Sequence, residues 1–405
     1  MTGRLVVVGG GQAGFALIAK LRALSDMRPI TLVAGEASLP YQRPPLSKKY
    51  LTRDMTLDRL IYRPESWYHD NRIELRLSTR VTAIDRAARS LALSSGEMLA
   101  YDTLVLATGA TPRHLPESLG GALDGVYTLR DFADADRLAE ALQPGKRALI
   151  IGGGYIGLEA AAVARSLGLT VTLIEMADRI LQRVAAPATS DLVRALHQAR
   201  GVELREGTGL RALIGTEGRL AAALLSDGTE LPIDLAIVGI GVTANDALAR
   251  EAGLATANGV VVDAEARTAD PSIFAIGDCA VLPFGGMMVR LESVQNAVDQ
   301  AEALAAILTG GTEPYHPKPW FWSDQYDAKL QIAGFGLGHD HTVTRPGTRP
   351  GSASVWYFRE GRLIAVDAIN DAKAYVIGKK MIESGLSPTP EQAADPAADL
   401  KALLG

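Results

Sequence analysis

Apolar residues along the chain form short runs of strand length, and stretches with helical spacing follow two of these runs. The run at 5–8 leads into a glycine-rich turn and then into a helical pattern, and the run at 148–151 does the same. Strands that alternate with helices in this way predict βαβ units and a parallel sheet. We therefore expect an α/β protein that contains the same kind of unit at its start and again in its middle.

The regions between and after these units contain further strand patterns. A β-rich segment spans 73–106, and after a proline-containing linker at 314–319 the chain becomes β-rich again before a final helix. The other expected elements are strands at 30–33, 170–174, 222–225, 235–238, 331–333, 353–359 and 363–369, and helices at 134–142, 290–305 and 372–384.

Both glycine-rich turns have the same spacing. Gly9-x-Gly11-x-x-Gly14 and Gly152-x-Gly154-x-x-Gly157 each follow a strand and begin a helix, the setting in which this motif indicates a dinucleotide site. The first glycine permits a tight turn, the second lets the backbone approach a pyrophosphate, and the third lets helix and strand pack closely. The helix N-terminus offers N–H groups to the phosphates. Two such motifs in one chain predict that a nicotinamide is brought against a second redox cofactor.

A carboxylate after the second strand of each unit is a candidate for binding a ribose. Glu175 lies 18 residues after Gly157 at the end of an expected strand, and Arg179 is the first cation after it. A 2′-phosphate would meet a negative charge there, which predicts NAD(H) rather than NADP(H). Glu36 lies 22 residues after Gly14, and it is either the ribose-binding carboxylate of the first unit or a solvated loop carboxylate.

A proline-rich loop at 39–50 carries two cations, Arg43 and Lys48, that are close in sequence to the first nucleotide site. The loop is either an ordinary surface loop or a device that brings Lys48 to the redox ring. Ser47, which follows two prolines, is expected to cap a short helix.

Two turns that follow buried strands are candidates for a close approach of backbone to a cofactor. They are Ala107-Thr108-Gly109 and Gly239-Ile-Gly241, and a further β-type run ends in Gly277-Asp278. Asp278 could accept a hydrogen bond from a ribityl hydroxyl, or it could be a helix cap or turn residue. Trp320 is either a core aromatic or a side chain that closes over a ring cofactor.

Composition narrows the class of protein. A chain of 405 residues, 47% of them hydrophobic and 21% charged, suggests a globular protein of two to three domains. The net charge of −5 gives no basic field for nucleic acid, and the apolar runs are too short for a membrane span of about 20 residues. The N-terminus enters a strand at once, so we expect no signal peptide and a cytoplasmic protein. The single cysteine, Cys279, excludes an internal disulfide, and no metal site is predicted.

Eight motifs lie in one order along almost the whole chain. The glycine fingerprints at 9–14 and 152–159 are common to the wider glutathione-reductase-like superfamily, whereas the strings at 44–48 and 320–325 are more specific; the others are at 106–109, 239–241, 275–278 and 292–294. Together they resemble the FAD-dependent ferredoxin reductases of bacterial oxygenase systems. The resemblance implies a glutathione-reductase-like α/β fold, with two Rossmann-like dinucleotide-binding domains for FAD and NAD and a C-terminal α/β interface domain.

The resemblance also implies domain boundaries. The FAD domain would be discontinuous, formed by residues 1–110 and 242–318. The NAD domain would be inserted in it at 111–241, and a C-terminal domain at 319–405 would cover the flavin.

The resemblance further assigns roles to residues of this chain. Lys48 would lie near the flavin N5 and pair with Glu159, and Trp320 would lie where nicotinamide and flavin meet, so these three are the catalytic candidates. With the candidates from the sequence pattern, the expected FAD-binding residues are Gly9, Gly11, Ala13, Gly14, Glu36, Arg43, Lys48, Val81, Ala107, Thr108, Gly109, Arg130, Asp278 and Val294. The expected NAD-binding residues are Gly152, Gly154, Tyr155, Ile156, Gly157, Glu175 and Gly241.

The expected function is transfer of hydride from NADH to FAD and of single electrons from FAD to a two-iron two-sulfur ferredoxin that serves a monooxygenase or dioxygenase. A reductase for rubredoxin and an NADH-sensing flavoprotein of the apoptosis-inducing-factor type are the alternatives. Docking of an acidic ferredoxin is expected to be transient and electrostatic. Candidate docking cations are Arg290, Lys329, Lys373, Lys379 and Lys380.

Overall fold

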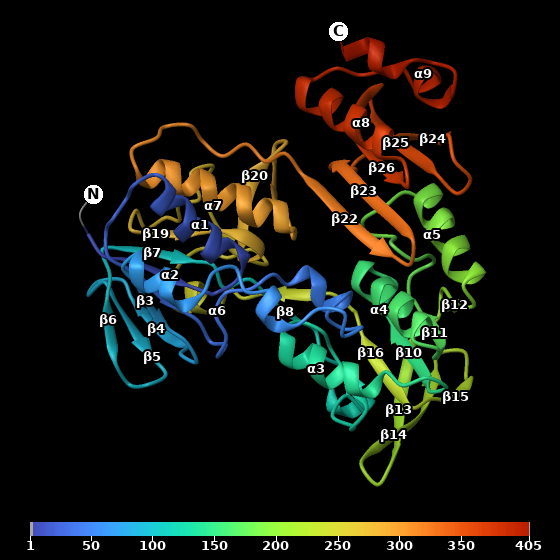
Figure 1. Cartoon of the computed structure of the whole chain (residues 1–405), viewed down its shortest axis with the longest axis horizontal. Coiled ribbons are helices and arrows are strands. Elements are labelled where there is room, and N and C mark those ends of the chain that lie inside the picture. The colour runs from blue at the N-terminus through green and yellow to red at the C-terminus, as the bar shows by residue number, and fades with distance from the viewer. Residues whose placement is uncertain (1–2, 405) are drawn as a thin grey trace. The chain divides into compact units, whose positions relative to one another are not determined.

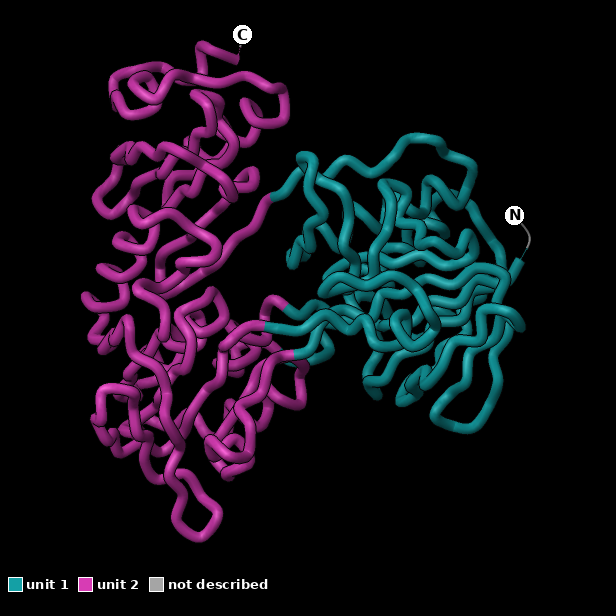
Figure 2. The backbone as a smooth tube through the Cα atoms, turned by 180° about the vertical axis from the view of Figure 1, so that it is seen from behind, with its two compact units in different colours: residues 1–43, 56–111, 242–319 teal, residues 44–55, 112–241, 320–405 magenta. Residues whose placement is uncertain are grey.

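The chain divides into two compact units, and the computed structural model describes residues 3–404. Unit 1 is formed by residues 1–43, 56–111 and 242–319, and unit 2 by residues 44–55, 112–241 and 320–405 (Figure 2). Each unit is therefore built from three separate segments of the chain.

A five-stranded parallel sheet is the centre of unit 1 (Figure 1). Its first strand is apolar and buried along its whole length, as expected for a parallel sheet covered on both faces. Helices α1 (Gln12–Ala23) and α7 (Val294–Leu308) pack against each other and share one apolar core with the sheet. The strands, in sheet order, are β19 (Ile273–Ala275), β7 (Thr103–Leu106), β1 (Leu5–Val8), β2 (Ile30–Val33) and β3 (Ile73–Arg76).

Smaller elements complete unit 1. There is an antiparallel meander of β4 (Val81–Asp85), β5 (Ser90–Leu93) and β6 (Met98–Ala100), a small sheet of β18 (Val260–Val261), β20 (Ala280–Phe284) and β21 (Met287–Val289), and a strand pair of β8 (Ala110–Pro112) and β17 (Val242–Ala244). The short helices are α2 (Glu65–Asp70) and α6 (Ala247–Glu251), with 3-10 turns at Leu57–Arg59 and Gly277–Cys279.

Unit 2 contains a second five-stranded parallel sheet and its own meander. Helix α4 (Tyr155–Ser166) follows the central strand, and its fully buried alanines allow it to pack closely on the sheet. The strands, in sheet order, are β12 (Glu203–Arg205), β11 (Thr170–Ile174), β10 (Arg147–Ile151), β16 (Leu235–Val238) and β9 (Val126–Tyr127). The remaining elements are the meander β13 (Leu210–Thr216), β14 (Arg219–Leu225) and β15 (Glu230–Pro232), the helices α3 (Phe132–Ala141) and α5 (Pro187–Ala199), and the 3-10 turns Pro44–Ser47 and Glu117–Leu119.

The two parallel sheets share one order of elements. In unit 1 the order is β1, α1, β2, β3, the meander β4–β6, then β7; in unit 2 it is β10, α4, β11, β12, the meander β13–β15, then β16. In both sheets the first strand lies between the second strand and the strand that returns after the meander. The chain thus leaves the first strand to one side and later returns to its other side, which is the topological switch point where doubly wound sheets bind ligands.

The C-terminal part of unit 2 is an antiparallel sheet covered by helices. Helix α8 (Ala372–Ser384) packs on the sheet, and α9 (Pro390–Ala394) and the 3-10 turn Leu400–Leu404 follow it. The strands, in sheet order, are β22 (Trp320–Gln325), β23 (Ala328–Gly334), β26 (Arg362–Ile369), β25 (Ala353–Arg359) and β24 (His341–Pro346).

A buried polar cluster joins helix α5 to this antiparallel sheet. The Asp367 carboxylate accepts hydrogen bonds from the Tyr357 hydroxyl and from the Thr189 hydroxyl, the latter at 2.7 Å. The Tyr357 hydroxyl in turn accepts the N–H of Ala186 at 2.9 Å. Burial raises the pKa of Asp367 from 3.8 to about 6, although both hydroxyls oppose the shift.

The raised pKa of Asp367 predicts a pH-dependent stability. The folded protein retains the Asp367 proton up to about pH 6, whereas the unfolded chain loses it near 3.8. The contribution of this group is therefore fully present below the lower pKa and is lost as pH rises through the upper one, by about 3 kcal/mol. We expect Asp367→Asn, which cannot ionise, to remove this fall. Denaturant unfolding of both proteins at pH 5 and pH 8 should show about half of this fall in the wild type, about 1.5 kcal/mol, and equal pH dependence of the two proteins would contradict the prediction.

The predicted fold class is confirmed, and several expected elements match to the residue, among them β2, β11, β16, β25 and α8. The expected cap at Ser47 is wrong. Residues Pro44–Ser47 form a 3-10 turn that ends at Ser47, and the Ser47 hydroxyl donates to the Glu159 carboxylate at 2.6 Å. A buried carboxylate is a stronger acceptor partner than any neutral group of the turn.

Candidate functional site: two nucleotide-binding sheet edges and a buried ion pair

The carboxyl edge of the parallel sheet in unit 1 brings three of the predicted segments together. The Gly9 N–H donates to the Val33 carbonyl at 2.8 Å, and the Ala107 N–H donates to the Val8 carbonyl at 2.8 Å. One strand further along, the Ile276 N–H donates to the Leu106 carbonyl at 3.0 Å. The turns that start at residues 9, 107 and 276 therefore leave the sheet side by side at its switch point.

The three glycines of the first fingerprint meet different surroundings. A Cβ on Gly9 would lie 2.1 Å from the Ala107 carbonyl oxygen, and one on Gly14 would lie 2.1 Å from the Gly9 carbonyl oxygen. A Cβ on Gly11 would meet nothing within 4 Å. The first and third glycines are therefore required for packing, whereas Gly11 faces open space, as a glycine that lets a ligand approach the backbone must.

The helix that follows this turn is built to accept an anion. The N-cap of α1 is Gly11, which provides no side-chain hydrogen bond, and the first turn contains no acidic residue. The first N–H groups, at the positive end of the helix dipole, therefore receive no side-chain cap. Ala13, in the first turn, is 7% exposed and lies against Gly277. The edge fits the pyrophosphate of a dinucleotide such as FAD.

The other predicted FAD-binding residues of unit 1 are placed on the surrounding loops. The Glu36 carboxylate accepts the Tyr41 hydroxyl at 2.6 Å and pairs with the Arg43 guanidinium. Thr108 and Asn245 exchange hydrogen bonds of 2.7 and 2.8 Å, which fix the turn that contains Ala107 and Gly109. Of the remaining predicted residues, Val81 is buried at the start of β4, Asp278 lies in the 3-10 turn after β19, and Val294 is the first residue of α7.

The parallel sheet of unit 2 repeats the same edge. A Cβ on Gly152 would lie 2.5 Å from the Gly239 carbonyl oxygen and one on Gly157 would lie 2.1 Å from the Gly152 carbonyl oxygen, but one on Gly154 would meet nothing within 4 Å. Gly154 is the N-cap of α4, again without a side-chain cap or an acidic residue in the first turn. This edge also fits a dinucleotide pyrophosphate.

The predicted ribose-binding carboxylate of unit 2 is held in place by the backbone. Glu175 follows β11 directly, and its two carboxylate oxygens accept the N–H groups of Gly153 at 2.7 Å and Ala177 at 2.8 Å. In unit 1 the residue that follows the matching strand is Ala34, so Glu36 lies two residues further along its loop. Gly241 has a φ of +99°, and the Arg183 guanidinium lies 3.4 Å from where its Cβ would be.

The open middle glycine of unit 2 yields a prediction with a matched control. We expect Gly154→Ala to leave the unfolding free energy within about 1 kcal/mol, because φ is −80° and the space is open, but to weaken NADH binding about 10-fold. Gly157→Ala should instead destabilise the protein by about 3 kcal/mol, because its Cβ would clash with backbone. Calorimetric titration and thermal unfolding of both variants measure this. Undiminished NADH binding by Gly154→Ala would contradict it.

Lys48 and Glu159 form an ion pair inside unit 2. The Lys48 Nζ lies 2.9 Å from the Glu159 Oε1, and the side chains are 20% and 3% exposed. Glu159 is a buried residue on the second turn of α4, two residues after the last fingerprint glycine. The carboxylate also accepts the hydroxyls of Ser47 at 2.6 Å and Ser323 at 2.7 Å. A buried carboxylate with a cation and two hydroxyl donors is fully compensated.

Sequence reasoning missed the neighbours of this carboxylate. Ser323 and Gln325 are buried at alternate positions of β22, and His197 on α5 contacts Gln325. Two polar residues at the inward positions of a strand are unusual, and this alternation was a signal that the sequence offered. The string at 320–325 was matched as a family motif without a role for either residue.

Aromatic residues lie at the start of α4 and of β22. The Tyr155 ring packs on the Phe321 ring with centroids 4.6 Å apart, and burial raises the pKa of Tyr155 well above its usual value. The centroids of the Trp320 and Trp322 rings are 5.4 Å apart, and the Lys379 ammonium lies 5.5 Å from the centroid of the Trp320 ring.

Ile156, Arg130 and Arg290 are three further predicted residues. Ile156 is 47% exposed on α4, and the Arg130 N–H donates to the Asp134 carboxylate at 3.0 Å. Arg290, one of the candidate docking cations, has a side chain that is 11% exposed and pairs with Glu292 at 2.5 Å. Partial burial leaves this guanidinium little surface to offer a partner.

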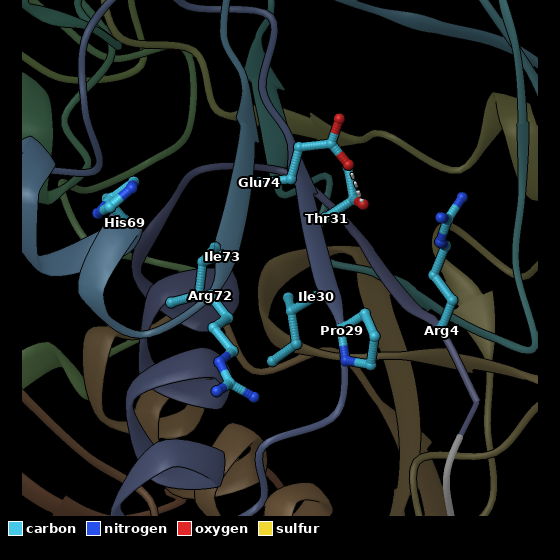
Figure 3. A pocket seen from close by; sticks show the side chains of 8 residues that line it. All are labelled: Arg4, Pro29, Ile30, Thr31, His69, Arg72, Ile73 and Glu74. Atoms are coloured by element: carbon cyan, nitrogen blue, oxygen red, sulfur yellow. Dashed lines mark hydrogen bonds between the residues drawn. The ribbon is translucent and has the colours of Figure 1, made fainter.

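A shallow cavity in unit 1 lies at the opposite, amino-terminal edge of the parallel sheet. The Thr31 hydroxyl donates to the Glu74 carboxylate at 2.9 Å there, and the side chains of Arg4 and Arg72 point in different directions (Figure 3). Ligands of doubly wound sheets bind at the carboxyl edge, so this cavity is not assigned to the site.

Residues 3–404 form neither of two further kinds of feature. No group of three or more His, Cys, Asp or Glu side chains in this part of the chain is arranged to hold a metal ion. None of its helices combines the length and apolar character needed to cross a bilayer.

Two nucleotide-type sheet edges, one in each unit, define an α/β oxidoreductase of the two-dinucleotide class. The chain belongs to the pyridine nucleotide-disulphide oxidoreductase family, which matches residues 3–301, and it ends in a reductase C-terminal domain, matched at residues 320–404. The family name refers to a disulphide, but Cys279 is the single cysteine of this chain and it is buried.

Individual relatives agree along the whole chain. Rhodocoxin reductase of Rhodococcus erythropolis is 43% identical over 399 residues, which cover 98% of this chain and 93% of that protein. The crystal structure of the ferredoxin reductase for the CYP199A2 system from Rhodopseudomonas palustris has a TM-score of 0.95 at 42% identity and covers 99% of this chain and 100% of that one. The covalent putidaredoxin reductase–putidaredoxin complex has a TM-score of 0.96 at 39% identity, with 99% and 98% covered. The predicted resemblance to the ferredoxin reductases is confirmed.

Proposed function

We propose that the protein is an FAD-containing reductase that takes hydride from NADH and passes single electrons to a two-iron two-sulfur ferredoxin serving a monooxygenase or dioxygenase. The observation that carries the proposal is the pair of sheet edges, each with an open middle glycine and an uncapped helix start. One edge would bind FAD as a resident cofactor, and the other would bind NADH as a substrate that is replaced after each turnover.

The two edges differ in a way that supports assigning NADH to unit 2. Glu175 stands directly after the second strand, with both oxygens oriented by backbone N–H groups, where it can accept ribose hydroxyls. A 2′-phosphate would meet this carboxylate, so NADH is favoured over NADPH. We accordingly assign FAD to the domain formed by residues 1–110 and 242–318, and NADH to the domain at 111–241, with residues 319–405 as the domain that covers the flavin.

In this mechanism the chain supplies position and charge. FAD, when bound, supplies the redox chemistry by accepting a hydride and releasing electrons singly. The turns at residues 9–14, 107–109 and 276–278 would hold it, and α1 would neutralise part of its phosphate charge. In unit 2, the N-terminus of α4 would hold the phosphates of NADH, while Glu159 fixes the Lys48 ammonium at one place by a short ion pair. An ammonium that is already held in place does not have to reorient when charge moves during hydride transfer. Such a preorganised group therefore stabilises the transition state.

The proposal extends to the partner and the compartment. A transient, electrostatic encounter suits a carrier that must leave after one electron. Exposed cations that could attract an acidic ferredoxin include Lys373 and Lys380, and we place the protein in the cytoplasm, where NADH is supplied.

The test is NADH-dependent reduction of a purified ferredoxin encoded beside this gene. The FAD-loaded protein should bleach on anaerobic addition of NADH and should reduce cytochrome c only when the ferredoxin is present. Faster turnover with a rubredoxin would favour the rubredoxin reductase, and a long-lived coloured complex with poor turnover would favour the sensing flavoprotein. A protein that stays colourless after FAD is supplied, or that NADH does not reduce, would show the proposal to be wrong.

A further inference from the structure

A chain of hydrogen bonds continues from the Lys48–Glu159 ion pair through the interior of unit 2. Ser323 lies 2.7 Å from Glu159, the Gln325 Nε2 lies 3.1 Å from the Ser323 Oγ, and the His197 Nε2 lies 2.8 Å from the Gln325 Oε1. Ser323 and His197 are fully buried, and Gln325 is 3% exposed. The chain ends at the half-buried Tyr326, whose hydroxyl lies 3.5 Å from the His197 Nδ1.

The direction of every hydrogen bond in this chain is fixed by the carboxylate. Ionised Glu159 can only accept, so the Ser323 hydroxyl donates to it, and the Ser323 oxygen must accept from the Gln325 Nε2. The Gln325 Oε1 then faces His197, whose Nε2 must carry the proton. Each group donates toward the carboxylate, so each bond polarises the next in the same sense.

The neutral state of His197 agrees with this arrangement. Burial lowers the pKa of His197, although the hydrogen bond to Gln325 opposes the shift. A neutral ring with its proton on Nε2 leaves Nδ1 free to accept the Tyr326 hydroxyl, which is the donor at the end of the chain.

We propose that Ser323, Gln325 and His197 are positioning residues that hold the Glu159 carboxylate, and through it the Lys48 ammonium, in one orientation for hydride transfer from NADH. The inference rests on the proposed function and deepens it. Glu159 Oε1 is the atom that both Lys48 and Ser323 contact, so a carboxylate free to rotate would move the lysine with it. Residues of helix α5 and strand β22 thereby fix the position of the Lys48 ammonium, which belongs to the loop at 44–55.

The first experiment compares stopped-flow reduction by NADH of the FAD-loaded wild type and two variants. We expect Ser323→Ala to lower the limiting rate about 10-fold, since a hydrogen bond to a charged group is lost, and to leave the NADH dissociation constant within about twofold. Gln325→Met, which keeps the length of the side chain, should lower the rate about threefold. Ser323→Thr retains the hydroxyl and should keep a rate near that of the wild type.

A matched control separates positioning from general loss of packing. Thr189→Val removes a buried hydroxyl that lies on helix α5, whereas Ser323 lies on β22. The Thr189 hydroxyl donates to Asp367 and not to Glu159. It should lower the melting temperature but leave the rate of reduction unchanged. A Ser323→Ala rate equal to that of the wild type, or a Thr189→Val rate equally slowed, would overturn the proposal.

A second measurement does not depend on activity. In 15N-histidine-labelled protein, with or without FAD, the His197 signals should show the Nε2–H tautomer at neutral pH and a pKa lower than that of an ordinary histidine, and Gln325→Met should shift the Nε2 signal. An Nδ1–H tautomer, or ordinary titration, would contradict the chain of bonds. If NADH fails to reduce the wild type, the proposed function fails, while the histidine signals still decide whether the positioning network exists.

Discussion

Replacing Lys48 with methionine is expected to slow reduction of the FAD-loaded protein by NADH about 100-fold while FAD stays bound. Methionine keeps most of the length of the side chain but removes the ammonium that lies 2.9 Å from Glu159. A loss of about 3 kcal/mol of stabilisation in the transition state corresponds to this factor. The Glu159 carboxylate, 3% exposed, would also lose its cation, so the protein should become less stable by a similar amount.

Two further variants make the Lys48 experiment decisive. Lys49→Met changes the neighbouring, exposed lysine and should behave like the wild type in stopped-flow reduction. The double variant Lys48→Met/Glu159→Gln removes the unpaired charge, so it should regain thermal stability without regaining the rate. An unchanged rate in Lys48→Met would remove this residue from the mechanism.

Combining Glu175→Ala with Met176→Arg is expected to shift preference from NADH toward NADPH about 100-fold in the ratio of kcat/KM values. The carboxylate that would repel a 2′-phosphate is removed, and a guanidinium is added at a side chain that is 81% exposed and so has room for it. Loss of repulsion and one charged hydrogen bond together supply about 3 kcal/mol.

The single variants divide this effect between its two causes. Met176→Arg alone should gain little, because Glu175 would pair with the new cation. Glu175→Ala alone leaves the Gly153 and Ala177 N–H groups without their acceptor, so it should weaken NADH binding as well. If the double variant keeps the preference for NADH of the wild type, another residue reads the ribose.

The fold and the nucleotide-type edges could be predicted because their signals are local. Gly157 is required by a contact within its own turn, with the Gly152 carbonyl, and residues 148–151 of the strand before this turn are all apolar. Spacing alone therefore located both edges. Helix and strand boundaries were less certain where a cap decides them, as at α7, which begins after Ser293 and not at the expected residue 290.

The polar network around Glu159 could not be predicted in the same way. Ser323 is 164 residues from Glu159 and Ser47 is 112 residues from it, so no local pattern links them. The error at Ser47 has the same origin, because a serine after prolines has the local pattern of a cap. The role of Ser47 is decided by its tertiary partner, the buried carboxylate of Glu159 on helix α4.

The shared order of elements in the two halves has a historical consequence. A tandem duplication of one ancestral strand–helix–strand module, followed by divergence, would leave this pattern. One difference concerns the ion pair: seven residues after the first glycine, the early half has Ala16 and the late half has Glu159. The order of elements is common to both halves, and the acidic side chain belongs to one of them, which is the pattern expected when side chains change on a repeated scaffold.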